Sequence, residues 1–140
     1  MHIIHLDDQN LFRKGVENFL SKEFSNLHIE AFSDNTTALE YVQKCLVCEN
    51  KIDCIITDYN HQGDNGLEFA KAVRTIEKEY NCHMPIIMLT MRHDELLKQA
   101  AIDGLLDVYF TKDITCEEIT TFINKYSCNK SCDLFDLHII

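Results

Sequence analysis

Five short apolar runs alternate with five segments in which apolar residues recur at helical spacing. The apolar runs lie near residues 2–6, 28–32, 53–57, 85–89 and 107–111. The helical segments carry pairs four residues apart: Phe12 and Val16, Ala38 and Val42, Phe69 and Val73, Leu96 and Ala100, and Ile119 and Ile123. Nearly continuous apolar strands are typical of a parallel sheet covered by helices on both faces. We therefore predict an α/β fold with a doubly wound, five-stranded parallel sheet and five helices.

The ends of these runs also suggest how the strands are ordered. Four runs end next to a residue that we consider a candidate for the site, whereas the run at 28–32 provides none. This difference fits a strand order of 2-1-3-4-5, in which the second strand is an edge and the switch point lies between the first and third. Asp34 is the predicted N-cap of the second helix, Thr115 with Glu118 is a candidate capping box, and Gly104 is expected to end the fourth helix.

Length and charge restrict the function classes. A chain of 140 residues is expected to form one domain, and we place it at residues 1–126, with 127–140 as a tail or truncated linker. The net charge is −10 and no basic run is present, so this domain is a poor candidate for nucleic-acid binding. No apolar stretch approaches the roughly 18 residues of a membrane span, and no signal peptide is visible. We expect a cytoplasmic protein without a membrane partner.

Seven cysteines are many for this length, but their number is odd and an ordinary core needs no disulfides. We interpret them as reduced thiols. Cys45 and Cys48 have zinc-like spacing, and Cys128 and Cys132 form a second candidate pair. A structural zinc needs four convergent ligands. Cys45 and Cys48 lie within a helical pattern, which favours packing as their role.

Chemically reactive side chains gather at the ends of four apolar runs. Asp7 and Asp8 follow the first run, Asp58 the third, Thr90 the fourth and Lys112 the fifth. The carboxyl ends of parallel strands meet at one edge of a sheet, so these side chains should cluster there. Three carboxylates repel one another unless a hard cation such as Mg²⁺ binds. A hydroxyl and an ammonium suit phosphoryl oxygens, and Asp58 is the natural nucleophile for an aspartyl phosphate.

With these residues in place, the stretch from residue 1 to about 126 resembles the CheY-like receiver domain of bacterial two-component response regulators. The opening IIHLDDQNLFRKGVENFL and the pair Lys112-Asp113 are similar to receivers that precede LuxR-type helix-turn-helix domains. The sequence departs from the family at His61-Gln62, where Met-Pro is usual, and at Met91, where a small residue is usual. Met91 is expected to crowd the pocket. His61 is either a phosphate or metal contact or an exposed loop residue.

The resemblance implies a role for each matching residue. Asp58 would accept phosphate from a sensor histidine kinase or phosphotransfer protein. Asp7, Asp8, Asp58 and the backbone carbonyl of Asn60 would hold Mg²⁺. Lys112 and Thr90 would contact the phosphoryl group, Thr90 and Tyr109 would act as the switch, and Gly66 matches a family glycine. The signal would pass to the face of the fourth helix, fifth strand and fifth helix, with homodimerisation on phosphorylation or a DNA-binding output domain as further expectations.

Two alternatives stay open at this point. A phosphatase of the haloacid-dehalogenase type also uses an aspartyl nucleophile and Mg²⁺, but it carries a second Asp two residues after the nucleophile. Asn60 occupies that position after Asp58, and Gln9 occupies it after Asp7. An inactive pseudo-receiver is the second alternative, and the complete set of charged residues argues against it. We expect no enzymatic activity beyond self-phosphorylation from small phosphodonors and self-dephosphorylation.

Overall fold

A computed structural model describes residues 1–61, 64–91, 94–113 and 116–126 of the chain. Strands and helices alternate in it: β1 (His2–Leu6), α1 (Asn10–Glu23), β2 (His28–Phe32), α2 (Asn35–Val47), β3 (Cys54–Asp58), β4 (Asn60–His61), β5 (Asp64–Asn65), α3 (Gly66–Tyr80), β6 (Ile86–Thr90), α4 (Glu95–Ile102) and β7 (Val108–Thr111). A last helix covers residues 116–126.

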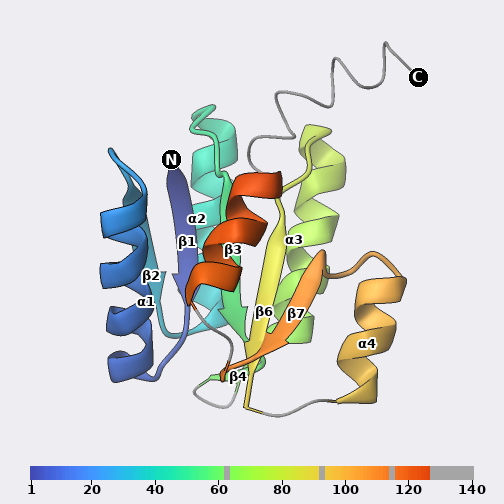
Figure 1. Ribbon diagram of the computed structural model, residues 1–140. Helices are drawn as coiled ribbons and strands as arrows, with labels where there is room; N and C mark the ends of the chain where they lie inside the picture. The colour runs from blue at the N-terminus through green and yellow to red at the C-terminus, as the bar shows by residue number, and fades with distance from the viewer. Residues whose placement is uncertain (62–63, 92–93, 114–115, 127–140) are drawn as a thin grey trace, which may run out of the picture.

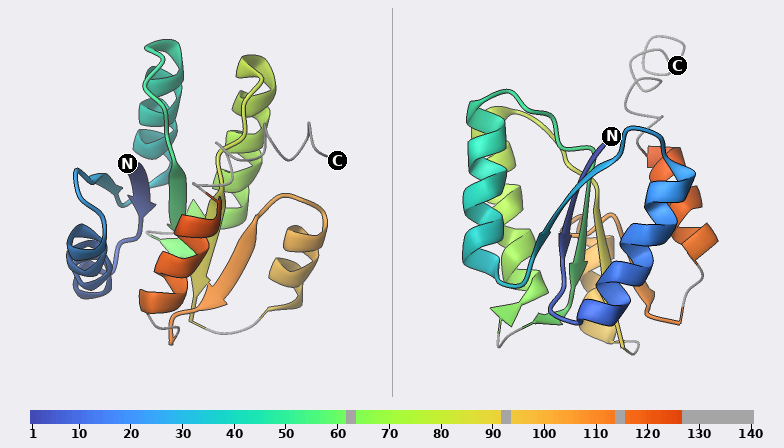
Figure 2. Two further views of the ribbon diagram at one scale, coloured as in Figure 1. Left: turned by 45° about the horizontal axis from the view of Figure 1, so that its top comes forward. Right: turned by 90° about the vertical axis from the view of Figure 1, so that its left-hand side faces the viewer.

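Five parallel strands form the main sheet, in the order β2-β1-β3-β6-β7. This is the predicted order 2-1-3-4-5, and the predicted doubly wound α/β fold, which is of the flavodoxin-like class, is confirmed. Helices α2, α3 and α4 pack on one face of the sheet, and α1 and the helix at 116–126 pack on the other (Figures 1 and 2).

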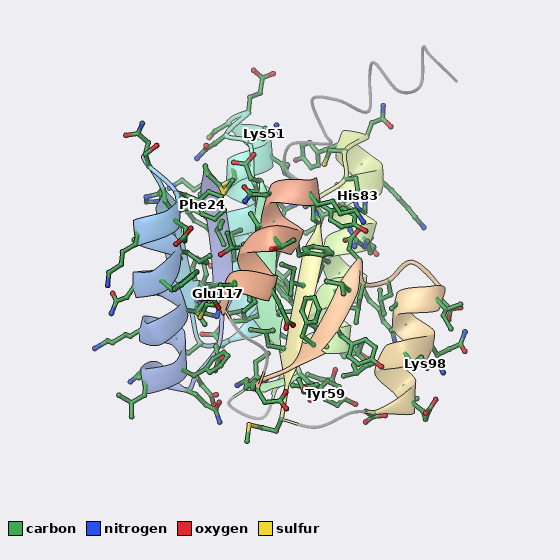
Figure 3. All side chains as sticks on the ribbon, in the orientation of Figure 1. Phe24, Lys51, Tyr59, His83, Lys98 and Glu117 are labelled. Carbon is green, nitrogen blue, oxygen red and sulfur yellow. The ribbon has the colours of Figure 1, made fainter. Side chains whose placement is uncertain are left out.

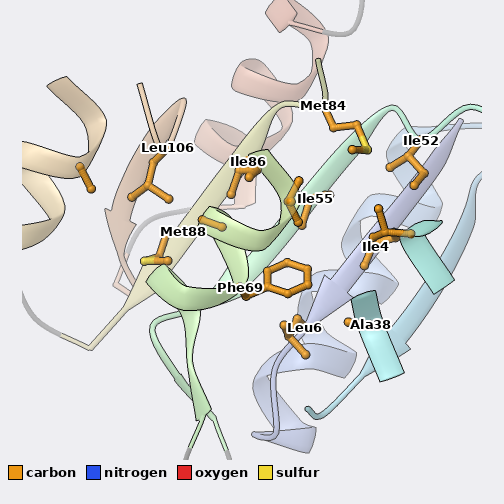
Figure 4. Packing of buried hydrophobic residues seen from close by; sticks show 14 of the residues in the cluster. Ile4, Leu6, Ala38, Ile52, Ile55, Phe69, Met84, Ile86, Met88 and Leu106 are labelled. Carbon is orange, nitrogen blue, oxygen red and sulfur yellow. The ribbon is translucent and has the colours of Figure 1, made fainter. Parts of the chain in front are cut away.

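Alternate residues of each strand supply the two cores. Ile4, Ile55 and Ile86 point to the face of α2 and α3, whereas Ile3 and Ile87 point to the face of α1. Figure 4 shows the ring of Phe69 from α3 packed close to Leu6 of β1. Side chains of this size, fully buried, each stabilise the fold by about 1.5–3 kcal/mol, so both helical layers are held firmly against the strands that carry the site.

Strand boundaries differ from the predictions by one residue in places. The run predicted at 85–89 begins as β6 at Ile86, because Pro85 has no N–H to donate to the ladder. The run predicted at 53–57 becomes β3 at Cys54–Asp58, and Asp53 instead accepts a hydrogen bond from the backbone N–H of His2 at 2.8 Å. The short antiparallel pair β4–β5 was not predicted, since two-residue strands leave no periodicity to detect.

The helix ends follow local chemistry. Asp34 caps α2 by accepting from the N–H of Thr37, as predicted, and Asp94 caps α4 in the same way. Gly104 follows the end of α4 with a φ of 83°, a left-handed conformation that suits glycine. Thr115, the predicted cap of the last helix, lies outside the described residues. In the part of the chain that the structure covers, no helix has the length and apolar character needed to span a membrane.

Candidate metal and phosphoryl site

Four neighbouring strands deliver the predicted residues to one edge of the sheet. Asp7 directly follows β1, Asp58 ends β3, Thr90 ends β6, and Lys112 directly follows β7. Each of these strands is paired in parallel with the next, so their carboxyl ends lie together. Figure 3 shows Tyr59, the residue after β3, at this edge and His83 at the opposite edge.

Three carboxylates converge there. Asp7, Asp8 and Asp58 each place one oxygen within 4.8 Å of the others. Asp7 and Asp58 are buried, and Asp8 is half-buried. Burial, followed by the charge of Asp7, raises the pKa of Asp58, and the nearby ammonium of Lys112 only partly offsets this. The folded protein therefore holds negative charge at this edge at an energetic cost.

Lys112 places a positive charge beside these carboxylates. Its Nζ lies 3.1 Å from Oδ2 of Asp7 and 3.3 Å from Oδ2 of Asp58, and only 6% of its side chain is exposed. The ammonium also lies 4.7 Å from the centroid of the Phe12 ring and donates a hydrogen bond to Oε1 of Gln9. This ammonium pairs with two of the three carboxylates, so negative charge remains at the site for a cation to neutralise.

The donor set fits a hard divalent cation. Carboxylate oxygens are the ligands that Mg²⁺ prefers. Oδ1 of Asp7 accepts from the N–H of Gln9 at 2.8 Å, whereas its buried Oδ2 accepts no hydrogen bond of standard geometry. This buried oxygen pairs with Lys112 but accepts no hydrogen bond, and it lies beside two further carboxylates. Such an oxygen is suited to binding a metal ion. The backbone of Asn60 lies in β4, two residues beyond Asp58.

Thr90 and Tyr109 lie at different depths. Thr90 is buried, and its backbone carbonyl accepts from the N–H of Lys112 at 2.7 Å, which fixes the backbone of the lysine beside β6. Tyr109 of β7 is half-buried and packs against the core on the side of α4. Met91, expected from the resemblance to crowd the pocket, is 71% exposed, so its side chain lies mainly in solvent.

Gly66 explains how α3 can begin so close to the proposed acceptor. Its N–H donates to the carbonyl of Tyr59 at 2.6 Å. A Cβ at this position would collide with the backbone carbonyl of Asp58 and would lie 2.8 Å from Cε of Met88. Only a residue without a side chain allows this approach. The side chain of Asn65 caps the helix by accepting from the N–H groups of Leu67 and Glu68.

Other candidates do not join the site. Cys45 is buried and Cys48 is exposed, both are free thiols, and neither belongs to a metal-binding group among the residues described. Cys128 and Cys132 lie outside those residues, and the side chain of His61 does too. His5 is buried, and burial together with the charges of Arg13 and Lys112 lowers its pKa to about 3.

Comparisons with known proteins point to one family. The sequence model of the response regulator receiver domain covers residues 3–124. The chain is 28% identical over 123 residues to the chemotaxis protein CheY of Pseudomonas aeruginosa, covering 85% of this chain and 93% of that protein. It is 30% identical over 121 residues to the cyclic di-GMP phosphodiesterase response regulator RpfG of Xanthomonas campestris pv. campestris, covering 85% of this chain but only 30% of RpfG.

This chain belongs to the response regulator receiver domain family. The receiver domain of the Arabidopsis thaliana histidine kinase CKI1, solved with Mg²⁺, shares the fold at a TM-score of 0.77 and 20% identity, over 89% of this chain and 90% of that one. The predicted receiver and its role in two-component signalling are confirmed. The haloacid-dehalogenase alternative is not supported, since the family match, the strand order and CheY all indicate a receiver. The finer resemblance to LuxR-type regulators stays a prediction.

Two residues near Lys112 were not predicted to take part in the site. Gln9 and Phe12 contact the ammonium from the start of α1. Gln9 was noted only as a residue that is not aspartate, and Phe12 only as an apolar helix position. The sequence signal was their position within five residues of the aspartate pair, on the loop and first turn that must pass the strand ends.

Proposed function

We propose that Asp58 of this receiver accepts a phosphoryl group, in a reaction that requires Mg²⁺. The observation that carries the proposal is the convergence of three carboxylates, two of which pair with the ammonium of Lys112. An oxygen of Asp58 attacks the phosphorus atom, and the bond from phosphorus to the donor breaks as the acyl phosphate forms. Burial raises the pKa of Asp58, but a bound cation favours its ionised form and so opposes that shift.

The metal would be held by Asp7, Asp8 and Asp58, with the backbone carbonyl of Asn60 as a further ligand. When bound, Mg²⁺ neutralises charge on the phosphoryl oxygens and holds them next to the attacking carboxylate. The related fold of the CKI1 receiver was solved with Mg²⁺, which supports this choice of cation. Lys112 already lies 3.3 Å from Asp58 and would donate to a phosphoryl oxygen on that residue.

The donor would be a sensor histidine kinase or a phosphotransfer protein. Such a donor carries its phosphoryl group on an imidazole nitrogen, a good leaving group. The receiver would then change no substrate of its own. Its chemistry would be limited to phosphorylation of Asp58, including from small phosphodonors, and to loss of that group by hydrolysis. The phosphodiesterase activity in the name of RpfG belongs to a protein of which this chain spans 30%.

Thr90 and Tyr109 would transmit the effect of phosphorylation to the surface of the domain. Thr90 is buried at the end of β6, and Tyr109 is half-buried on the neighbouring strand β7. A hydrogen bond from the Thr90 hydroxyl to the phosphoryl group would draw the end of β6 inward and leave space into which Tyr109 can turn. The face formed by α4, β7 and the helix at 116–126 would change with it. That face would bind an output partner or a second receiver.

The cellular location of the protein and the bounds of its domain also belong to this proposal. We expect a cytoplasmic receiver at residues 1–126, followed by a tail at 127–140. A DNA-binding output domain is one form that the output could take. The receiver itself, with a net charge of −10, is not expected to bind nucleic acid.

Intact mass spectrometry after incubation with acetyl phosphate tests the proposal. The wild-type protein should gain one phosphoryl group when Mg²⁺ is present and none when EDTA has removed it. Asp58→Ala should gain none, and Asp103→Ala, which removes an exposed aspartate at the end of α4, should behave as wild type. Equal labelling of wild type and Asp58→Ala would refute the assignment.

A further inference from the structure

Gln9 is the N-cap residue of α1, but its side chain does not cap the helix. Ser, Thr, Asp and Asn are preferred at such N-cap positions, because their short side chains reach the N–H groups of the first turn. Asp34, Asn65 and Asp94 do this for α2, α3 and α4. Gln9 makes no capping hydrogen bond. Its Oε1 accepts from Nζ of Lys112 instead, 103 residues further along the chain.

A residue that departs from the local preference for a capping side chain, with no gain in stability, often serves a function. Gln9 replaces the missing capping bond with contacts to two residues of the site. The backbone N–H of Gln9 donates to Oδ1 of Asp7 at 2.8 Å, while its side chain binds the ammonium that lies 3.1 Å from Oδ2 of the same aspartate. One residue therefore orients both a proposed metal ligand and the proposed phosphoryl ligand.

The contacts of Lys112 fall into two classes. Its ion pairs to Asp7 and Asp58 depend on charges that change when a cation binds or when Asp58 carries a phosphoryl group. Its contacts to the amide of Gln9 and to the ring of Phe12 are with neutral groups and do not depend on that change. The neutral pair can thus hold the ammonium in place while its two charged partners are modified.

We propose that Gln9 is a positioning residue for phosphoryl transfer, acting through Lys112. This inference rests on the proposed function. Gln9 fixes one N–H of the ammonium, so that the remaining donors are directed at the position of the phosphoryl oxygens. Phe12 supports the same placement from the side of α1. Gln9 binds neither the cation nor the phosphoryl group, so its loss should affect phosphoryl binding far more than Mg²⁺ binding.

Gln9→Ser provides the sharpest variant, because serine removes the acceptor from Lys112 and also improves the helix cap. Asn10→Ser, the same change one residue further along α1, is the matched control. Calorimetric titrations would measure affinity for Mg²⁺ alone and for beryllofluoride, a phosphoryl mimic, at saturating Mg²⁺. A hydrogen bond of ordinary net strength predicts mimic binding weaker by about 3- to 10-fold in Gln9→Ser, with Mg²⁺ affinity changed by less than about 2-fold.

Each result bears on the proposal. Wild-type mimic affinity in Gln9→Ser would overturn it, and so would an equal loss of Mg²⁺ and mimic affinity, which would mean a general disturbance of the site. Urea unfolding should show Gln9→Ser to be at least as stable as wild type, so weaker binding cannot be assigned to unfolding. If wild type itself bound no mimic at saturating Mg²⁺, the proposed function would fail before the role of Gln9 was reached.

Discussion

Asp58 is buried beside a second buried carboxylate, and this placement has an energetic consequence in the metal-free protein. Burial and the charge of Asp7 raise the pKa of Asp58, so the folded state disfavours its ionised form more than the unfolded state does. For a carboxyl with a raised pKa, stability falls as the pH rises through that pKa, because the unfolded chain releases the proton more readily. Above that raised pKa the full cost is present, and the ammonium of Lys112 makes this cost smaller.

Asp58→Asn should therefore stabilise the metal-free protein at pH 7. Asparagine keeps the shape of the side chain and removes one of the repelling charges. The gain should shrink as the pH is lowered and vanish below the ordinary carboxyl pKa of 3.8, where Asp58 is protonated in both states. Thermal unfolding in EDTA at a series of pH values measures this. A variant less stable than wild type at pH 7 would show that the Lys112 ion pair outweighs the repulsion.

Gly66 provides a second test at the level of one residue. Gly66→Ala places a Cβ against the carbonyl of Asp58 and the end of Met88, and overpacking of this kind typically costs about 1–3 kcal/mol. Gly15→Ala is the matched control, since Gly15 lies within α1 and nothing lies within 4 Å of its added Cβ. That control should be stabilised by about 0.5–1 kcal/mol. Urea unfolding of the two variants should shift in opposite directions, and equal shifts would argue against the close approach.

At the scale of secondary-structure elements, a polar cluster ties α3 to the starts of β6 and β7. Nη2 of Arg74 donates to Oδ2 of Asp107 at 2.8 Å, and Nη1 donates to both carboxylate oxygens of Glu77. Asp107 also accepts from the N–H of Ile86 at 2.7 Å, and its Oδ1 lies 2.9 Å from Nε2 of His83. This cluster lies at the edge of the sheet opposite the site and fixes the strands from their amino ends.

Asp107→Asn should destabilise the protein by about 1–3 kcal/mol at pH 7, since it removes a half-buried charge that accepts from several donors. Burial alone would raise the pKa of Asp107, but the bonds from His83 and Ile86 and the charge of Arg74 outweigh it, and the pKa is lowered. The stabilisation is thus present above pH 3.8 and is lost as the pH falls through the lowered pKa. Denaturant titrations at pH 7 and at acid pH, with exposed Asp103→Asn as control, should show a penalty only for Asp107 and only at the higher pH.

The elements were predictable from sequence because their signals are local. Apolar runs gave β1 and β2 at their observed bounds, and side-chain chemistry gave the cap at Asp34 and the helix end at Gly104. The carboxylate cluster followed from the position of each residue at a strand end. The contact between Gln9 and Lys112 could not be predicted, because it joins residues 103 apart and follows from the orientation of two side chains. The Arg74 cluster escaped prediction for the same reason.

For the whole molecule, the net charge of −10 includes three carboxylates held together at one edge of the sheet. A cation that binds only the folded state stabilises it by mass action, by about 2.7 kcal/mol at a concentration 100 times its dissociation constant. Mg²⁺ should therefore raise the melting temperature of wild type, and should do so much less in Asp7→Asn. Sodium chloride at matched ionic strength controls for general screening. A rise of the same size with sodium would argue against a specific metal site.

The central claim is that Asp58 itself carries the phosphoryl group. Borohydride cleaves an aspartyl phosphate and reduces that aspartate to homoserine, so tandem mass spectrometry can locate it in the chain. After incubation with acetyl phosphate and Mg²⁺, the account predicts homoserine at position 58 and unmodified aspartate at positions 7 and 8. Reduction at Asp7 or Asp8, or at no aspartate in a protein that has gained phosphate, would contradict it.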